Sequence, residues 1–292
     1  MTIKLFASDM DGTLLNENHV ISDRTAAAIK KLQETTDIEF IIATGRSFKS
    51  ASVLTQAQDI YCRMINLNGA SIHEKDGTLT DSNPLLTETV LSVIQHLDTL
   101  AIDYAVSTPN NYYVADYEGF IKRIAHFMNV SQEEVLAAAD GTDEVTNAQL
   151  LAHYGDVKPI TEMELTRDNP ALKILLFSSN TDLLDQVRQY LSNFSDLDVT
   201  SSAADHIEVT HINAQKGLAV EAYAQSQGYT LDEVATIGDS LNDRSMLQKA
   251  KHSYAMDNAP DHIKAMSQNI APANTIDGVA IILEQLIAEY AK

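Results

Sequence analysis

Apolar strands and amphipathic helices alternate at both ends of the chain, and this alternation limits the folds open to it. Before residue 80, strands are predicted at residues 3–8, 40–43 and 64–67, with helices at residues 22–34 and 47–58. The same order resumes late in the chain, with strands at residues 206–210, 234–237 and 253–256, and helices from about residue 215 and over residues 276–288. The fold class is therefore α/β, with a Rossmann-like, doubly wound parallel sheet that binds its ligands at the carboxyl ends of the strands.

The middle of the chain has a different pattern. Helices are predicted at residues 87–97, 120–128 and 182–194, and strands at residues 104–107, 112–115 and 172–178. Asn110 and Asn111 suit a hairpin turn between two of these strands. We expect an inserted α/β domain over residues 84–194, with residues 1–83 and 195–292 together forming the sheet domain.

From its composition we expect the chain to be a globular protein of the cytoplasm. The chain has 292 residues, of which 45% are hydrophobic, and no apolar run approaches the length of a transmembrane helix. Asp9 and Asp11 interrupt the apolar N-terminal stretch, which argues against a signal peptide. The single cysteine, Cys62, excludes a disulfide framework and cysteine-rich zinc motifs.

The charge balance narrows the class of partner. A formal net charge of -21 disfavours nucleic acid and anionic membrane surfaces as partners. An anionic small molecule would need local cations to hold it against the overall field. We expect a small-molecule partner, with the chain a monomer or a weak homo-oligomer.

The first strand runs directly into two aspartates, Asp9 and Asp11, followed by Gly12. Aspartate is unfavourable in strands, and residues two apart in an extended chain point the same way. Two carboxylates aimed at one point repel each other unless a cation lies between them or one carries a proton. The pattern predicts a site for a nucleophile, an acid and a metal ion, although an Asx turn or a helix cap would use the same residue types.

Three more polar segments follow strands or open helices of the sheet domain. Thr44-Gly45-Arg46 offers a hydroxyl, backbone N–H groups and a cation before a helix N-terminus, where an anion could bind. Lys216 begins a helix, a position that the helix dipole disfavours for a cation. The segment from Gly238 to Asp243 brings two acids and an amide to a strand-to-helix turn. Taken singly, these residues also suit a solvated lysine and an N-terminal helix cap.

The order and spacing of these segments resemble the haloacid dehalogenase superfamily. Asp9-Met10-Asp11-Gly12-Thr13, Thr44, Lys216 and Gly238-Asp239-Ser240-Leu241-Asn242-Asp243 match its four motifs in turn. The long insertion between the second and third motifs resembles the C2 cap of the Cof-type subgroup. Further matches to that subgroup are Asn68-Gly69-Ala70, Ile207-Glu208-Val209-Thr210, Met256-Asp257-Asn258-Ala259 and Asp277-Gly278-Val279.

The resemblance implies a phosphatase that works through an aspartyl-phosphate. It assigns Asp9 as the nucleophile and Asp11 as the general acid and base. It assigns Mg²⁺ to the carboxylates of Asp9 and Asp239 and to the backbone carbonyl of Asp11, with Asp243 orienting a metal-bound water. The residues implied at the phosphate are Thr44, Lys216 and Asn242, with the backbone near Met10 and Gly45 and the cation of Arg46.

The resemblance leaves the substrate open. Small phosphorylated metabolites, above all sugar phosphates, are expected, and pyridoxal phosphate or flavin mononucleotide would suit the same chemistry. A phosphomutase on the same scaffold, or a phosphate-binding protein without catalysis, are the alternatives. The presence of Asp9, Asp11, Lys216 and Asp239 argues against the last of these.

Overall fold

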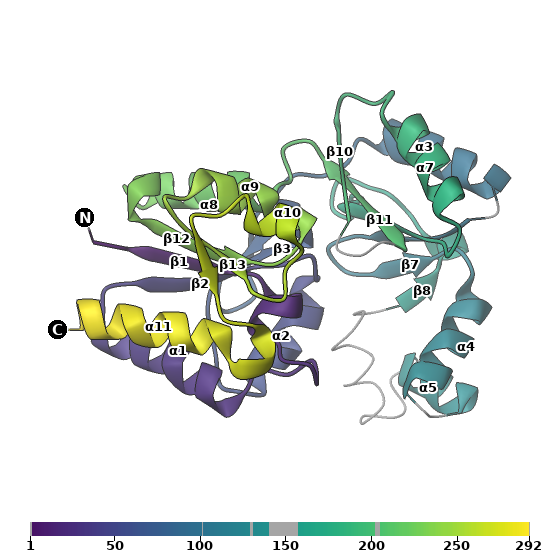
Figure 1. Ribbon diagram of the computed structural model, residues 1–292. Coiled ribbons are helices and arrows are strands. Elements are labelled where there is room, and N and C mark those ends of the chain that lie inside the picture. The colour runs from purple at the N-terminus through teal and green to yellow at the C-terminus, as the bar shows by residue number, and fades with distance from the viewer. Residues whose placement is uncertain (1, 101, 129–130, 140–156, 202–204, 292) are drawn as a thin grey trace. The chain divides into compact units, whose positions relative to one another are not determined.

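The computed structural model describes residues 2–100, 102–128, 131–139, 157–201 and 205–291, and Figure 1 shows it as a ribbon. The chain forms two compact units. The first comprises Met1–Gly45, Leu54–Ser82 and Asn213–Lys292, and the second comprises Arg46–Val53 and Asn83–Ile212. The second unit is thus mainly an insertion into the first.

The first unit is built on an eight-stranded sheet with the order β14-β13-β12-β1-β2-β3-β4-β5. The strands that pair in parallel are β14 (Asn269–Ala271), β13 (His252–Met256), β12 (Val234–Gly238), β1 (Leu5–Ser8), β2 (Glu39–Ala43) and β3 (Met64–Asn66). Two antiparallel strands, β4 (Ser71–His73) and β5 (Leu79–Ser82), extend one edge. Strand β1 lies between β12 and β2, so the ends of these three strands are neighbours.

Helices cover both faces of this sheet (Figure 1). One face carries α1 (Asp23–Thr35) and α11 (Gly278–Tyr290), and the other carries α8 (Lys216–Ser226) and α9 (Arg244–Lys249). Two shorter helices are α2 (Phe48–Gln56), whose first residues group with the second unit, and α10 (Asp261–Lys264). The predicted start of α1 is confirmed, because the Ser22 side chain accepts a hydrogen bond from the Thr25 backbone N–H.

The two faces of the sheet explain why its central strands are apolar throughout. Leu5 and Ile41 belong to a core cluster that includes Val220 of α8 and Met246 of α9. Because alternate strand residues point to opposite faces, their neighbours Phe6 and Phe40 lie on the other face, with stacked rings whose centroids are 6.0 Å apart. A strand buried on both faces shows no polar alternation.

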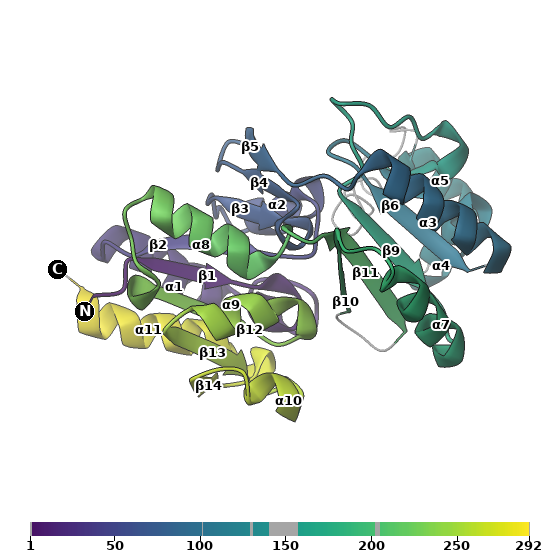
Figure 2. The same ribbon diagram turned by 90° about the horizontal axis from the view of Figure 1, so that it is seen from above.

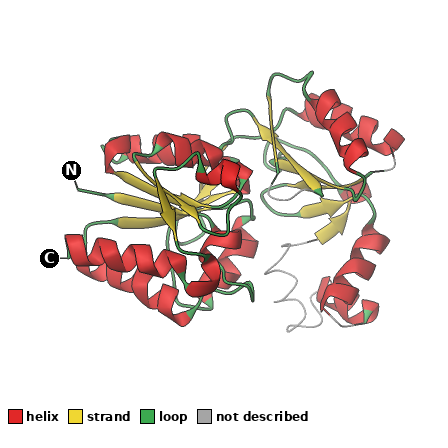
Figure 3. Cartoon of the chain, viewed as in Figure 1, coloured by secondary structure: helices red, strands yellow, loops and turns green. Residues whose placement is uncertain are grey.

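The second unit contains a six-stranded sheet with the order β10-β11-β9-β6-β7-β8. Figure 2 labels β6, β9, β10 and β11 of this sheet. Its strands are β6 (Asp103–Ser107), β7 (Tyr112–Val114), β8 (Val157–Pro159), β9 (Lys173–Phe177), β10 (Leu197–Thr200) and β11 (His206–His211). Its helices are α3 (Thr87–Leu100), α4 (Tyr117–Met128), α5 (Gln132–Ala139) and α7 (Thr181–Leu191), drawn in red in Figure 3. Side chains of α3 and α7 share one apolar core with β6, β9 and β11.

The observed boundary differs from the expectation that residues 195–292 belong wholly to the sheet domain. Strand β11 pairs antiparallel with β9 and β10, so residues 197–200 and 206–211 form part of the second sheet. The physical reason is visible in β11, where buried Ile207 and Val209 join the core of the second unit while Glu208 points the other way. Such alternation is typical of an antiparallel strand rather than of a doubly covered parallel one.

Candidate active site

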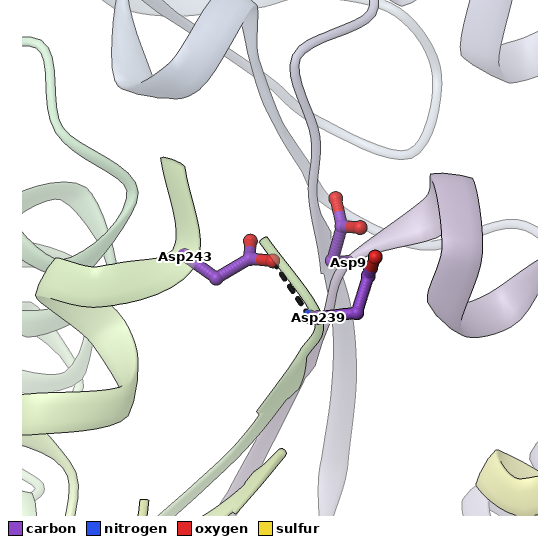
Figure 4. A group of neighbouring side chains, drawn as sticks. All are labelled: Asp9, Asp239 and Asp243. Atoms are coloured by element: carbon purple, nitrogen blue, oxygen red, sulfur yellow. Dashed lines mark hydrogen bonds between the residues drawn. The ribbon is translucent and has the colours of Figure 1, made fainter. Parts of the chain in front are cut away.

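Three aspartates meet at the carboxyl ends of β1 and β12 (Figure 4). Ser8 of β1 is paired with Ile237 of β12, so Asp9 and Asp239 both lie just beyond the carboxyl ends of these neighbouring strands. Asp243 comes from the short turn after Asp239. One carboxylate oxygen of each aspartate lies within 4.8 Å of the others. The strand order therefore brings together acids that lie far apart in the sequence.

Lys216 lies among these acids and has no exposed side-chain surface. Its Nζ donates to Asp9 Oδ1 and to Asp243 Oδ1, each at 2.6 Å. Burial alone would lower the pKa of this ammonium, but the carboxylates of Asp243 and Asp9 outweigh burial and raise the pKa above its ordinary value. The lysine therefore stays charged, and the interpretation of Lys216 as a solvated surface residue is wrong.

Asp243 is held by the backbone as well as by the lysine. Its Oδ2 accepts from the backbone N–H of Asp239 at 2.9 Å and of Ser240 at 3.0 Å. The capping interpretation of this segment is thus correct, and it describes the same carboxylate that binds Lys216. With both oxygens engaged, Asp243 fixes the turn that carries Asp239 and the position of the ammonium.

The electrostatics of the cluster favour a bound cation. Burial, followed by repulsion from Asp243, raises the pKa of Asp239 to about 7, against the hydrogen bond from Thr13 and the charge of Lys216. Burial is also the main cause of the raised pKa of Asp9, ahead of Asp243, and Lys216 only partly opposes it. Three ionised carboxylates beside one ammonium leave negative charge uncompensated.

The donor set fits a hard divalent cation such as Mg²⁺. All the candidate ligand atoms are carboxylate oxygens, which are the ligands that Mg²⁺ prefers. Gly12 leaves the room that Asp239 needs, because a Cβ at Gly12 would lie 2.4 Å from Asp239 Oδ2. Thr13 Oγ1 donates to the other oxygen, Asp239 Oδ1, at 2.7 Å and fixes the carboxylate.

The remaining residues of the first motif occupy a tight turn over Met10–Leu14. Gly12 has a φ of 78°, a value that glycine adopts without strain. The Asp11 side chain is exposed and is not one of the three clustered acids, whereas the Met10 side chain is fully buried. Asp9 and Asp11 therefore differ in environment.

The second motif follows β2, the strand next to β1. Thr44 is fully buried, and its backbone N–H donates to Ile65 O at 2.8 Å. Arg46 groups with the second unit, where its guanidinium donates to Ser50 Oγ at 3.3 Å. The structure thus places Thr44 and Gly45 in the first unit with the acids, and it assigns Arg46 to the other unit.

Sequence reasoning gave no site role to three residues that support this cluster. Thr13 binds Asp239, Asn258 Nδ2 donates to Gly12 O at 2.8 Å, and Asn68 Oδ1 accepts from Asn242 Nδ2 at 3.2 Å. Each lies within a segment that matches the superfamily pattern. Those matches were the available signal, but the long-range partners are not visible in the sequence.

The comparisons with known proteins identify the family of the chain. The sequence model of the haloacid dehalogenase-like hydrolases matches residues 6–283. The 5-amino-6-(5-phospho-D-ribitylamino)uracil phosphatase YwtE of Bacillus subtilis is 31% identical over 297 residues, covering 99% of this chain and 100% of that protein. The pyridoxal phosphate phosphatase YbhA of Escherichia coli is 24% identical over 282 residues, covering 96% and 97%.

A solved structure of a haloacid dehalogenase-like hydrolase from B. subtilis has the same fold. It superimposes with a TM-score of 0.82 at 26% identity and covers 97% of this chain and 100% of the other. The α/β fold and the expected family are thereby confirmed. Among the residues described, no helix combines the length and the apolar character needed to cross a membrane. The chain belongs to the haloacid dehalogenase-like hydrolases and is a phosphoric monoester hydrolase.

Proposed function

We propose that this chain is a Mg²⁺-dependent phosphatase of small sugar or sugar-alcohol phosphates that works through an aspartyl-phosphate on Asp9. The observation that carries the proposal is the buried contact of Lys216 with Asp9 and Asp243, beside a third carboxylate on Asp239. A nucleophilic carboxylate, a fixed cation and an all-oxygen metal site are the parts that phosphoryl transfer requires.

Asp9 attacks phosphorus with one carboxylate oxygen, and the bond to the leaving alcohol breaks. Lys216 holds the other oxygen, Oδ1, at 2.6 Å and so orients the nucleophile. The side chains of Thr44, Lys216 and Asn242, together with the backbone at Met10 and Gly45, bind phosphate oxygens. The carboxylates of Asp9 and Asp239 and the backbone carbonyl of Asp11 would hold Mg²⁺, which would offset the negative charge of the phosphoryl oxygens.

Asp11 handles the protons. Its carboxyl protonates the leaving alkoxide, and the resulting carboxylate then takes a proton from the water that attacks the aspartyl-phosphate. This second step restores the Asp9 carboxylate and releases inorganic phosphate. General acid–base assistance of this kind is worth about 10²–10⁴ in rate. The exposure of Asp11 leaves its carboxyl accessible to the leaving group and to water.

The substrate class rests on the relatives. YwtE, at 31% identity, is named for a substrate whose phosphate ester stands on a ribityl chain. YbhA, at 24% identity, is named for pyridoxal phosphate. The higher identity to YwtE favours a polyhydroxylated leaving group, with pyridoxal phosphate and flavin mononucleotide as the comparison substrates.

Phosphate release from a panel of metabolites tests the proposal. The panel contains hexose and pentose phosphates, sugar-alcohol phosphates, pyridoxal phosphate and flavin mononucleotide, each with Mg²⁺ and with excess chelator. We expect Mg²⁺-dependent release that is fastest with a sugar or sugar-alcohol phosphate. Asp9→Asn should abolish turnover, while Lys249→Met, which alters a partly exposed ion pair with Glu221 on the same unit, should leave turnover unchanged.

Three results would overturn parts of this proposal. Turnover that persists in Asp9→Asn would remove Asp9 as the nucleophile. Equal rates with Mg²⁺ and with chelator would remove the metal. A clear preference for pyridoxal phosphate over every sugar phosphate would keep the chemistry and replace the substrate class.

A further inference from the structure

Asn68 occupies an unusual backbone position at the carboxyl end of β3. Leu67, Asn68 and Gly69 all have positive φ angles, of 50°, 61° and 102°. The side chain of Asn68 is only 4% exposed. Left-handed backbone is unfavourable for residues with a Cβ, and leucine gains nothing from it, so the surrounding structure must hold this turn in place.

The turn contacts the three segments that carry the proposed phosphate-binding side chains Thr44, Lys216 and Asn242. The Asn68 backbone N–H donates to the carbonyl of Thr44 at 3.0 Å. The Asn68 side chain accepts from Asn242 Nδ2 at 3.2 Å. A Cβ on Gly69 would lie 2.8 Å from the carbonyl oxygen of Gln215, the residue that precedes Lys216, so the turn packs directly against the start of α8.

Asn242 is held at both ends of its amide. Its Oδ1 accepts from Ser240 Oγ at 2.7 Å, and one hydrogen of Nδ2 goes to Asn68 Oδ1. An amide nitrogen has two hydrogens. Within the described residues, the second Nδ2 hydrogen of Asn242 has no hydrogen-bond partner. The contact with Asn68 therefore fixes the direction in which this remaining N–H points.

We infer that Asn68 is a positioning residue for phosphate binding, which orients the amide of Asn242 and ties it to the segments of Thr44 and Lys216. This inference rests on the proposed function, because it takes Asn242 as a phosphate ligand. Asn68 itself donates nothing to substrate in this role. It contributes by keeping the segments of Thr44, Lys216 and Asn242 in one relative geometry while the phosphoryl group is transferred.

A double-mutant cycle tests this role. Asn68→Gly removes the amide while keeping a residue that adopts a φ of 61° without strain. Asn242→Ala removes the proposed ligand. We expect Asn68→Gly to lower kcat/KM about tenfold in the native background and less than twofold in the Asn242→Ala background, because the two residues act as a unit. The inhibition constant for inorganic phosphate should rise in parallel.

Asp59→Gly is the matched control, because Asp59 also has a positive φ, of 53°, and its side chain forms an exposed ion pair with Lys30. We expect its kcat/KM to equal that of the native chain. Thermal unfolding of each variant separates these effects from a loss of folded protein.

The outcomes distinguish the proposed phosphate role of Asn242 from the inferred positioning role of Asn68. If Asn242→Ala leaves kcat/KM unchanged, the proposed phosphate role of Asn242 is wrong. If Asn242→Ala lowers kcat/KM but Asn68→Gly has the same effect in both backgrounds, Asn68 acts independently of Asn242 and the inference is wrong. An unaltered kcat/KM in Asn68→Gly would overturn the inference as well.

Discussion

Lys216 and Asp243 are joined by a hydrogen bond of 2.6 Å between Nζ and Oδ1, and neither side chain has any exposed surface. A buried ion pair gains little net stability over apolar packing, but the loss of one partner leaves the other charge buried and uncompensated. The pair therefore fixes the geometry around Asp9. Removal of the Lys216 ammonium should destabilise the folded state, because it leaves buried carboxylates without a counter-charge.

Lys216→Met should lower the free energy of unfolding by about 3–5 kcal/mol in chelator, because Asp9 and Asp243 lose their shared cation. It should also lower kcat by a factor of about 10²–10³, the usual effect of removing a fixed transition-state donor. Urea unfolding and steady-state kinetics measure the two effects. Lys249→Met removes a partly exposed pair and should cost less than about 1 kcal/mol. Equal losses in the two variants would contradict the burial argument.

Gly12→Ala and Gly228→Ala form a matched pair for the metal site. Their φ angles are 78° and 77°, so both substitutions carry a similar backbone cost of about 1–2 kcal/mol. A Cβ at position 12 would lie 2.4 Å from Asp239 Oδ2, whereas nothing lies within 4 Å of a Cβ at position 228. We expect Gly12→Ala to raise the Mg²⁺ concentration for half-maximal activity about 10–100-fold and Gly228→Ala to leave it unchanged. If both variants need the same Mg²⁺ concentration for half-maximal activity, Gly12 does not affect Mg²⁺ binding.

The only cysteine of the sequence provides a test of core integrity. Cys62 is 5% exposed, and burial raises the pKa of its thiol to about 12. Because only the thiolate reacts at an appreciable rate, Ellman's reagent should label native protein very slowly at pH 8 and should label it rapidly in urea. Rapid labelling of the native protein would show that this part of the first unit opens readily.

His73 should make stability depend on pH. It is buried against Asn66, and burial lowers the pKa of its imidazole to about 4. The unfolded chain, with a histidine pKa of about 6.5, binds a proton first, so this contribution is complete above about pH 6.5 and is lost as the pH falls toward 4. Between pH 7.5 and 5 the loss from His73 is about 2 kcal/mol.

Urea unfolding at the two pH values, compared between the native chain and His73→Gln, isolates this contribution. The variant should show a pH dependence that is smaller by about 2 kcal/mol. His262→Gln is the control, because His262 is exposed on α10 and should leave the dependence unaltered. An identical pH dependence in all three proteins would show that His73 is protonated in the folded state.

Periodicity predicted the longer helices and the central strands of the first unit because burial leaves a clear local mark. The continuous apolar run over β2 and the cap at Ser22 are both local signals. The sequence does not predict the edge strand β5, because Thr80 and Asp81 give it no apolar face. Strand β11 was placed in the wrong domain because a strand's partner depends on residues distant in the sequence.

The candidate site could be predicted as a set of residues, but only partly as a geometry. The structure brings Asp9, Asp239, Asp243 and Lys216 together as expected from strand ends. The contact between Asn68 and Asn242 spans 174 positions and depends on a left-handed backbone. Neither a long-range partner nor a positive φ at a residue other than glycine leaves a reliable mark in the sequence.

The pairing of β1 with β12 has a consequence for synthesis on the ribosome. Asp9 is translated almost at once, but its strand lacks a neighbour on one side until residues 234–238 emerge. The second unit, which ends at residue 212, is translated before β12. It can therefore fold while the sheet of the first unit is still incomplete. Until then β1 presents an open apolar edge, which makes nascent or truncated chains prone to misassociation. Phosphatase activity should therefore be the last property the growing chain acquires.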